Sequence, residues 1–182
     1  SQARKFIFME YHAIEDRQSF GEIKEILRKK AEEGVEVRLF YDDVGSIGFI
    51  DPKFVQELEE WGIQCRIFNP IVPMVNLFMN NRDHRKITVV DGQIGFTGGY
   101  NLADKYFNIH SPYGYWKDTG IRLRGEAVGT LTLLFLEMWH AMDDSPVRGL
   151  YNYLPRHWER YNGQGYCLPY AYAPTEDQPL AE

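Results

Sequence analysis

A period of two runs through the stretch Val35-Glu36-Val37-Arg38-Leu39-Phe40-Tyr41, where Val, Val, Leu and Tyr alternate with Glu, Arg and Phe. Successive side chains of a β-strand point to opposite faces of the sheet, so this pattern predicts a strand. Immediately before it, apolar residues recur at helical spacing over residues 19–33, and Gly34 follows where a helix would end. The sequence therefore predicts a helix that turns back into a strand.

The same order of elements extends on both sides of this stretch. A strand-like segment covers residues 5–9, and Asp51-Pro52 begins a second helical pattern that Gly62 ends. Residues 63–67 alternate again, which predicts a third strand. Strands that alternate with helices are typical of α/β architecture with parallel pairing. We therefore expect a mixed, mostly parallel β-sheet flanked by helices.

Composition limits the classes of protein to consider. The chain has 182 residues, 44% of them apolar, which is enough for one folded domain. A formal charge of −6 opposes the electrostatic attraction on which nucleic-acid binding depends, so we expect no nucleic-acid partner. Two cysteines are too few for a disulfide scaffold. No apolar stretch is long enough to span a bilayer, so we expect the chain by itself to be soluble.

The second part of the chain predicts a hairpin, a helix and a tail. Residues 86–90 and 93–97 are strand-like and are joined by Asp91-Gly92, a dipeptide suited to a type I′ turn. A long amphipathic helix is expected from Glu126 onward. We expect residues 1–145 to form one domain and residues 146–182 to be an aromatic, proline-containing tail or linker.

Residues 69–80 interrupt the regular pattern with two prolines and many apolar side chains. One interpretation is a loop folded over the core. The other is an apolar wall for an acyl chain, because soluble proteins seldom expose so much contiguous apolar surface. Under the second interpretation, Met74, Leu77 and Phe78 are candidate lipid contacts.

The candidate catalytic and phosphate-binding residues lie between Asn81 and Asn101. Residues two apart on a strand share a face, so His84 and Lys86 can reach one phosphate group. The imidazole can attack phosphorus while the ammonium neutralises the non-bridging oxygens. Asn101 follows the pair Gly98-Gly99, where the backbone can approach a ligand closely, and can donate a further hydrogen bond to the same oxygens. No metal or other cofactor is needed for this chemistry.

The spacing His84-x-Lys86, four residues, Asp91, then Gly98-Gly99-x-Asn101 resembles the HKD motif of the phospholipase D superfamily. The similarity to bacterial cardiolipin synthases covers most of the chain. It includes the segments Phe8-Met9-Glu10-Tyr11, Gly34-Val35-Glu36-Val37-Arg38, Tyr41-Asp42-Asp43-Val44-Gly45-Ser46 and Trp116-Lys117-Asp118-Thr119. The resemblance implies a phospholipase D-like half-domain, the amino-terminal catalytic half of such an enzyme.

The resemblance implies a specific phosphatidyl-transfer reaction. Phosphatidylglycerol would be attacked by His84, glycerol would leave, and a second phosphatidylglycerol would displace the histidine to give cardiolipin. The expected setting is a bacterial cell membrane, with the catalytic part on the cytoplasmic side. Alternatives are a phospholipase D or another phosphatidyltransferase or phosphodiesterase, and a half-domain that has no activity on its own.

Asp91 and Asp118 are the two acidic candidates for the site. Asp91 belongs to the motif and counts among its catalytic residues, but the turn places it away from the face shared by His84 and Lys86, so a structural role in the hairpin is at least as well supported. The resemblance implies that an acidic residue orients the attacking histidine, and Asp118 stands at a similar distance. A carboxylate there could accept the second N–H of His84. Cardiolipin synthases often carry a histidine where this chain has Gly120.

One motif cannot complete the reaction. In-line displacement puts the attacking and leaving groups on opposite sides of phosphorus, so a second acid is needed. The superfamily uses two HKD segments, and this chain has one. The partner is therefore expected to be a second half-domain in the same parent chain, or a second copy of this chain in a dimer.

The remaining polar candidates have simpler interpretations. His12, His110, His140 and His157 have no partner at a meaningful spacing, and we expect them to be surface or core residues. Asp42 and Asp43, with Gly45 and Ser46, are expected to shape the loop after a strand, where α/β proteins bind ligands. A polar contact from this loop to a lipid head group is a second interpretation.

Overall fold

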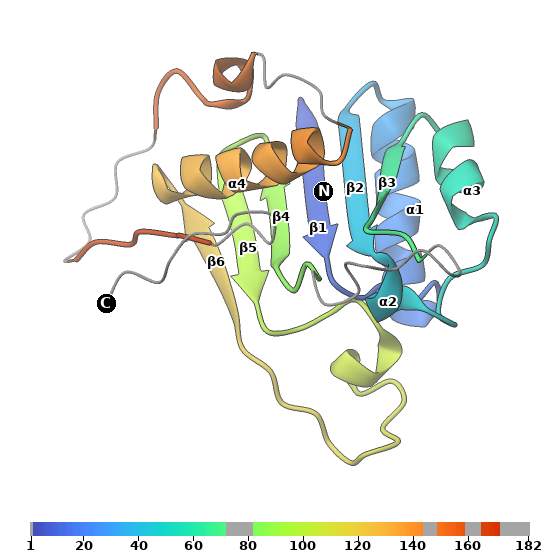
Figure 1. The fold of residues 1–182 in the computed structure, drawn as a ribbon. Coiled ribbons are helices and arrows are strands. Elements are labelled where there is room, and N and C mark those ends of the chain that lie inside the picture. The colour runs from blue at the N-terminus through green and yellow to red at the C-terminus, as the bar shows by residue number, and fades with distance from the viewer. Residues whose placement is uncertain (1, 72–81, 144–148, 159–164, 172–182) are drawn as a thin grey trace.

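A computed structural model describes residues 2–71, 82–143, 149–158 and 165–171. Its central feature is a six-stranded sheet with the strand order β3-β2-β1-β4-β5-β6 (Figure 1). The strands are β1 (Phe6–Tyr11), β2 (Glu36–Asp42), β3 (Gln64–Phe68), β4 (Lys86–Val90), β5 (Ile94–Gly98) and β6 (Gly120–Arg124). The helices are α1 (Gln18–Glu32), α2 (Asp43–Ser46), α3 (Phe54–Glu60) and α4 (Ala127–Ala141), with short 3₁₀ turns η1 (Asp104–Phe107) and η2 (Leu150–Tyr153).

The first half of the sheet confirms the predicted parallel crossovers. β1 pairs with β2, and β2 with β3, both in parallel, with α1 and α3 as the connecting helices. The sequence predicted that Asp51 begins the second helix, but α3 begins three residues later, at Phe54. The Asp51 carboxylate accepts a hydrogen bond from the Lys53 N–H at 2.8 Å, in the turn before the helix.

The second half of the sheet is antiparallel. β4 pairs antiparallel with β1 and β5, and β5 pairs antiparallel with β6. The fold class is therefore confirmed as mixed α/β, but the expectation that most pairings are parallel is wrong, because only two of the five are. The hairpin accounts for one of the antiparallel pairs: between β4 and β5, Asp91 and Gly92 both have positive φ angles, 54° and 65°, which suits a type I′ turn.

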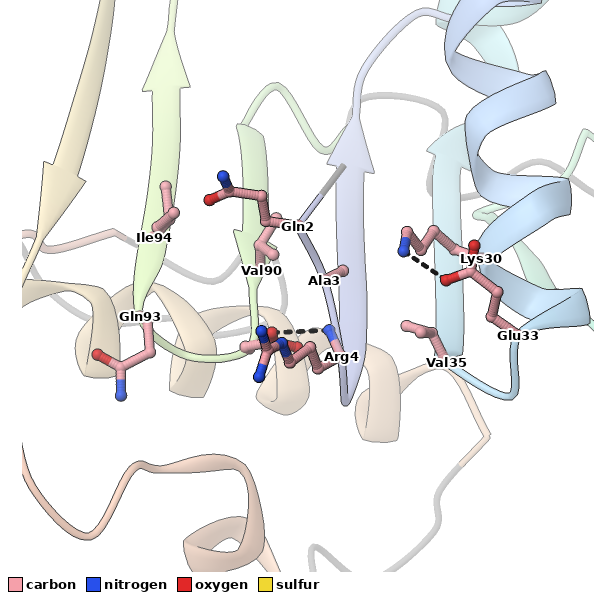
Figure 2. Close-up of a pocket in the computed structure, with 10 residues that line it drawn as sticks. Gln2, Ala3, Arg4, Lys30, Glu33, Val35, Val90, Gln93 and Ile94 are labelled. Atoms are coloured by element: carbon pink, nitrogen blue, oxygen red, sulfur yellow. Dashed lines mark hydrogen bonds and ion pairs between the residues drawn. The ribbon is translucent and has the colours of Figure 1, made fainter.

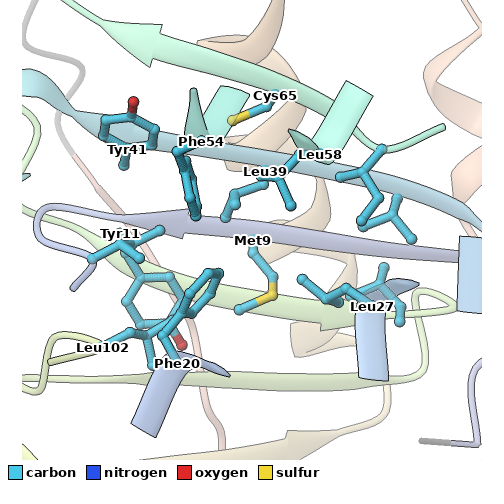
Figure 3. Close-up of a cluster of buried hydrophobic side chains, with 14 of the residues drawn as sticks. Met9, Tyr11, Phe20, Leu27, Leu39, Tyr41, Phe54, Leu58, Cys65 and Leu102 are labelled. Atoms are coloured by element: carbon cyan, nitrogen blue, oxygen red, sulfur yellow. The ribbon is translucent and has the colours of Figure 1, made fainter. Parts of the chain in front are cut away.

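Each face of the sheet is covered by helices. Met9 and Leu39 lie with Phe20, Phe54 and Leu58 in the core under α1 and α3 (Figure 3). On the other face α4 packs on the sheet, with the Phe135 ring stacked 4.7 Å from that of Phe8. Helices therefore cover both faces of the sheet, while the edge strand β6 stays largely exposed.

Part of the tail packs against the α4 side. Tyr153 contacts Phe6 edge to face at 5.2 Å, and its hydroxyl accepts a hydrogen bond from Arg38 at 2.8 Å. Trp158 lies over Gly129 of α4, where an added Cβ would be 3.1 Å from the indole ring. These described tail residues therefore complete the cover over the α4 core.

Candidate active site

His84 and Lys86 lie together at one end of the sheet. His84 is exposed just before β4, and Lys86 is the first residue of that strand, with 3% of its surface accessible. The Lys86 ammonium lies 3.1 Å from Nδ1 of His84 and also donates to the His84 carbonyl. As the period of two predicted, the two side chains meet.

The surroundings shift the pKa values of both groups downward. Burial lowers the pKa of His84, and the neighbouring side chains of Lys86 and His12 lower it further, against opposing effects from Asp83 and Asp42. Burial also lowers the pKa of Lys86 to about 8, although Asp83 and Asp118 act in the opposite direction. The site therefore favours a neutral imidazole beside a cation that is unusually easy to deprotonate.

Asn101 is buried and already engaged. Its side-chain oxygen accepts a hydrogen bond from the Ala13 N–H at 3.0 Å, and its amide nitrogen donates to the Tyr106 hydroxyl at 3.3 Å. The amide thereby ties the segment after β5 to the segment after β1. One amide hydrogen remains after the bond to Tyr106, which is the donor that a phosphate oxygen could use.

The glycine pair makes room for protein atoms. A Cβ on Gly98 would be 2.4 Å from the Thr119 carbonyl oxygen, and one on Gly99 would be 2.4 Å from a carboxylate oxygen of Asp118. Opposite Gly98 in the ladder, a Cβ on Gly120 would be 2.6 Å from the ring of Tyr100. These three glycines allow the start of β6 to approach β5 closely, which brings Asp118 to the site.

Asp118 sits differently from the expectation. Its carboxylate accepts hydrogen bonds from the Thr119 N–H at 2.7 Å and from the Trp116 indole N–H at 3.2 Å. It acts electrostatically on Lys86, whereas the charges that act on His84 come from other residues. Within the described residues, no hydrogen bond joins Asp118 to His84.

Asp91 lies at the opposite end of β4 from Lys86. Its carboxylate accepts backbone hydrogen bonds from Arg4, Lys5 and Phe6 at 2.8–2.9 Å. It therefore ties the start of β1 to the hairpin, which is the structural alternative considered for this residue, and its side chain does not meet His84.

A hollow adjoins Asp91 at that far end of the sheet (Figure 2). It has a volume of about 960 Å³ and lies between the N-terminal segment at Gln2–Arg4, the hairpin and the end of α1. Its walls include Lys30 and Glu33, which form an ion pair with each other. None of the residues that meet around His84 lines this hollow.

His12 is the residue that sequence reasoning missed. Its ring lies 4.7 Å from that of His84, centroid to centroid, and its Nδ1 is 2.8 Å from the Asp83 carbonyl oxygen. Gly45 leaves the space that the ring fills, since a Cβ there would be 2.8 Å from Nε2. Its place at the carboxyl end of a predicted parallel strand was the available signal.

Asp42 reaches the same site from the end of β2. One carboxylate oxygen accepts from the Gly45 N–H at 3.2 Å, so it shapes the loop as expected. The other accepts from the Asp83 N–H at 3.1 Å, beside His84. The backbone of Asp83 is therefore held at its N–H by Asp42 and at its carbonyl oxygen by His12.

A buried acidic pair lies behind this peptide. Glu10 of β1 and Asp83 are 0% and 1% exposed, and Nε of Arg85 lies 2.5 Å from Glu10 and 3.1 Å from Asp83. Burial and the neighbouring Asp83 carboxyl raise the pKa of Glu10 well above its usual value. The pair of Glu10 and Asp83 therefore favours a state in which Glu10 keeps its proton, and Arg85 balances the remaining negative charge.

A smaller hollow of about 300 Å³ adjoins His84 and Lys86. Leu131 and Leu134 of α4 and the segment 168–171 form its apolar wall. The predicted lipid contacts Met74, Leu77 and Phe78 lie outside the described residues. Over the residues that the structure describes, no cluster of three or more His, Cys, Asp or Glu side chains could hold a metal, and no helix could cross a bilayer.

Several known bacterial proteins are similar to this chain in sequence. A 40% identical, uncharacterised protein of Streptococcus mutans matches all of the chain, which covers 39% of that protein. Cardiolipin synthases of Halalkalibacterium halodurans and Staphylococcus aureus are 44% and 42% identical over 75% and 76% of the chain. The chain covers 27% and 28% of those two enzymes, so it spans well under half the length of its relatives.

Solved structures share the fold. The phospholipase D family member Nuc from Salmonella typhimurium superposes with a TM-score of 0.54 and 18% identity, over 77% of this chain and 78% of that one. NucT from Helicobacter pylori gives a TM-score of 0.54 and 16% identity, over 81% and 84%. The family model described as "Cardiolipin synthase, PLD-like domain" matches residues 1–116. With that match over more than half of its length, the chain belongs to the family of cardiolipin synthase phospholipase D-like domains.

Proposed function

We propose that this chain supplies one of two half-sites for phosphatidyl transfer, with His84 as the nucleophile and Lys86 as the phosphate clamp. The observation that supports it most is the buried Lys86 ammonium, 3.1 Å from the imidazole of His84 at an open strand end. A buried cation beside an exposed nucleophile suits a reaction in which negative charge develops on phosphorus-bound oxygens.

The first step forms a bond between a ring nitrogen of His84 and phosphorus. As that bond forms, the bond from phosphorus to the glycerol oxygen breaks, and the departing oxygen takes a proton from an acid on the opposite side. Lys86 turns from Nδ1 of His84 toward a non-bridging oxygen. The remaining N–H of Asn101 reaches the same phosphate.

The second step reverses the first with a different alcohol. The hydroxyl of a second phosphatidylglycerol loses its proton to the group that served as acid, attacks phosphorus and releases His84. Cardiolipin forms in this step, and with water in place of the alcohol the outcome is hydrolysis. The balance between the two depends on how well the closed site excludes water.

The second half-site requires another HKD segment, because this chain carries one such motif. A parent protein as long as the relatives has room for a second half-domain, since this chain spans 27–39% of their length. A symmetric dimer would provide the same pair of histidines.

Phosphatidylglycerol is the proposed substrate because the family includes cardiolipin synthases. The hollow of about 300 Å³ beside His84 supports a lipid substrate, since Leu131 and Leu134 give it an apolar wall next to the phosphate-binding residues. Activity on a membrane lipid places the parent enzyme at a bacterial membrane.

The test uses phosphatidylglycerol labelled in its phosphate group. Rapid denaturation of the dimeric chain, or of the parent protein, should trap label on the wild type through a bond that acid cleaves and alkali preserves, as expected of a phosphorus–nitrogen bond. The His84→Ala variant should trap none, while His157→Ala, which alters an exposed histidine outside the site, should match the wild type. Undiminished label on the His84→Ala variant would rule out His84 as the nucleophile.

A dilution series separates the half-site from its alternatives. Turnover of phosphatidylglycerol by this chain should vanish in strictly monomeric samples and appear only with dimer, measured by light scattering. Steady activity per chain in a monomer would contradict the half-site proposal. Absence of turnover in dimer and in the parent protein would favour the non-catalytic alternative.

A further inference from the structure

A second histidine packs against His84 at the proposed half-site. The ring centroid of His12 lies 4.7 Å from that of His84, and the two ring planes are inclined by 46°. In the ladder between β1 and β4, Tyr11 pairs with Lys86, so the residue after β1 lies beside the residues before β4. The side chain of His12 is 20% exposed. The two imidazoles therefore meet at the same end of the sheet, although they are far apart in the sequence.

The ring of His12 is anchored at one nitrogen and accommodated at the other. Nδ1 lies 2.8 Å from the carbonyl oxygen of Asp83. A carbonyl oxygen can only accept, so Nδ1 carries the proton and donates it. Nε2 faces Gly45, where a Cβ would be 2.8 Å away. The Asp83 carbonyl belongs to the peptide bond that leads into His84, so His12 holds the backbone that carries the proposed nucleophile.

The two rings also act on each other electrostatically. The charged or titratable groups around them are Asp42 at the end of β2, and Arg82, Asp83 and Lys86 in the approach to β4 and at its start. The Asp42 carboxylate lies 4.0 Å from Nδ1 of His12. Two imidazolium ions at this separation repel each other, so a proton on one ring disfavours a proton on the other.

From this contact, its backbone anchor and its charge, we infer that His12 is a positioning residue, which holds the His84 ring in its attacking orientation and disfavours a proton on it. A neutral imidazole keeps the lone pair with which a ring nitrogen can attack phosphorus, whereas an imidazolium has none. A proton taken up by His12, beside the Asp42 carboxylate, leaves His84 in its nucleophilic form. The kinetic consequence rests on the proposed function, while the contact and the coupled titration need no reaction.

Two other roles fit the ring of His12 less well. An acid for the leaving oxygen needs a proton to give, but the Nδ1 proton is engaged by the Asp83 carbonyl and Nε2 faces Gly45. In-line displacement also puts that acid across phosphorus from His84, whereas His12 contacts His84 directly. A ring that only fills space would leave the titration of His84 unchanged, and this difference can be measured.

An NMR titration of the histidine rings in the wild-type chain tests the inference without any reaction. The signals of the two rings are assigned by their loss in His84→Ala and in His12→Asn. Neutral His12 should be the tautomer protonated at Nδ1, which donates to the Asp83 carbonyl. The two rings should titrate in coupled steps. A His12 tautomer protonated at Nε2, or two independent one-proton curves, would overturn the inference.

Two substitutions separate the anchor of His12 from its ring. His12→Asn keeps a donor for the Asp83 carbonyl and removes the ring, while His12→Phe keeps a ring and removes the donor. Both remove the charge that lowers the pKa of His84, so this pKa should rise in both variants. His157→Asn, at an exposed histidine outside the site, is the matched control and should not change it. An unmoved His84 titration in both folded variants, checked by circular dichroism, would contradict the inference.

Kinetics of the dimeric chain or of the parent protein measure the positioning itself. His12→Asn should lower kcat for phosphatidylglycerol about 10²-fold with little change in KM, because the ring that holds His84 is missing. His12→Phe should lose less, and in both variants the acid limb of kcat/KM should move to higher pH. Unchanged kcat in both variants would refute the positioning role. If the wild type traps no label on His84, the proposed function fails, while the titration still decides whether His12 controls the charge of His84.

Discussion

The ammonium of Lys86 donates to Nδ1 of His84 across 3.1 Å, while both residues belong to one short segment of β4 and its approach. In this arrangement the imidazole nitrogen of His84 accepts the hydrogen bond that Lys86 would donate to a phosphate oxygen. A phosphate oxygen that takes its place keeps this hydrogen bond of Lys86 satisfied, which matters because Lys86 has only 3% of its surface accessible and keeps otherwise only its bond to the His84 carbonyl. Anion binding and release of the His84 ring are therefore coupled.

Replacing the clamp should cost transition-state stabilisation. We expect Lys86→Ala in the complete enzyme to lose about 3–4 kcal/mol, the cost of removing an aligned donor to a developing oxyanion. Steady-state kinetics with phosphatidylglycerol measure this as a fall in kcat/KM. A variant that kept more than about a tenth of wild-type activity would contradict the clamp role, since a 1.4 kcal/mol loss already accounts for a factor of ten.

The pH dependence of kcat/KM should report both residues. Burial lowers the pKa of Lys86 to about 8, so the cation is lost, and activity falls, as pH rises through that value. The pKa of His84 is lowered as well, so the acid limb should lie below 6.5. Lys86→Arg should move the alkaline limb to higher pH, because a guanidinium stays charged. An alkaline limb that did not move in Lys86→Arg would assign it to another group.

Asp118 should act through Lys86. Its negative charge raises the pKa of Lys86, so Asp118→Asn should shift the alkaline limb of the pH profile to lower pH. The acid limb, governed by His84, should stay in place. If the acid limb moved and the alkaline limb did not, Asp118 would instead orient His84, as the family resemblance implied.

Gly98 should tolerate no side chain. A Cβ there would lie 2.4 Å from the Thr119 carbonyl oxygen and 2.9 Å from Cα of Gly120, so Gly98→Ala must displace β6. Misplacement of about 1 Å near a reacting group can reduce the rate about 10²-fold, which is the fall in kcat that we expect. Gly21→Ala, on α1 with open space around it, is the control and should retain full activity.

The buried carboxyl of Glu10 should make stability depend on pH. Its raised pKa means that the folded chain keeps a proton that the unfolded chain releases above about pH 4.3, so stability falls as pH rises toward the folded pKa. Glu10→Gln cannot ionise and should remove this loss.

Thermal unfolding at pH 4 and pH 8 measures the effect. The Tm of Glu10→Gln relative to the wild type should be higher at pH 8 than at pH 4. Glu22→Gln, at an exposed position of α1, should show no such difference. A difference for Glu10→Gln of the opposite sign would mean that Glu10 is ionised in the folded chain.

The local sequence determined most of the elements and the central pair of the site. The alternation in residues 35–41 became β2, and Asp91-Gly92 became a turn with two positive φ angles. His84, just before β4, and Lys86, the first residue of that strand, met as their spacing of two residues predicted. These features depend on dihedral preferences and short spacing, and both can be read from one segment.

Only the tertiary structure decided which distant residues join that pair. His12, Asp42 and Asp83 come together because β1, β2 and the approach to β4 end at the same edge of the sheet. Sequence spacing carries no information on such neighbours, since they are fixed by strand order and by close approaches such as Gly45 to His12 and Gly99 to Asp118. The antiparallel direction of β4 likewise followed from its pairing with β1, which placed Lys86 opposite Tyr11 at the open end and Asp91 at the other.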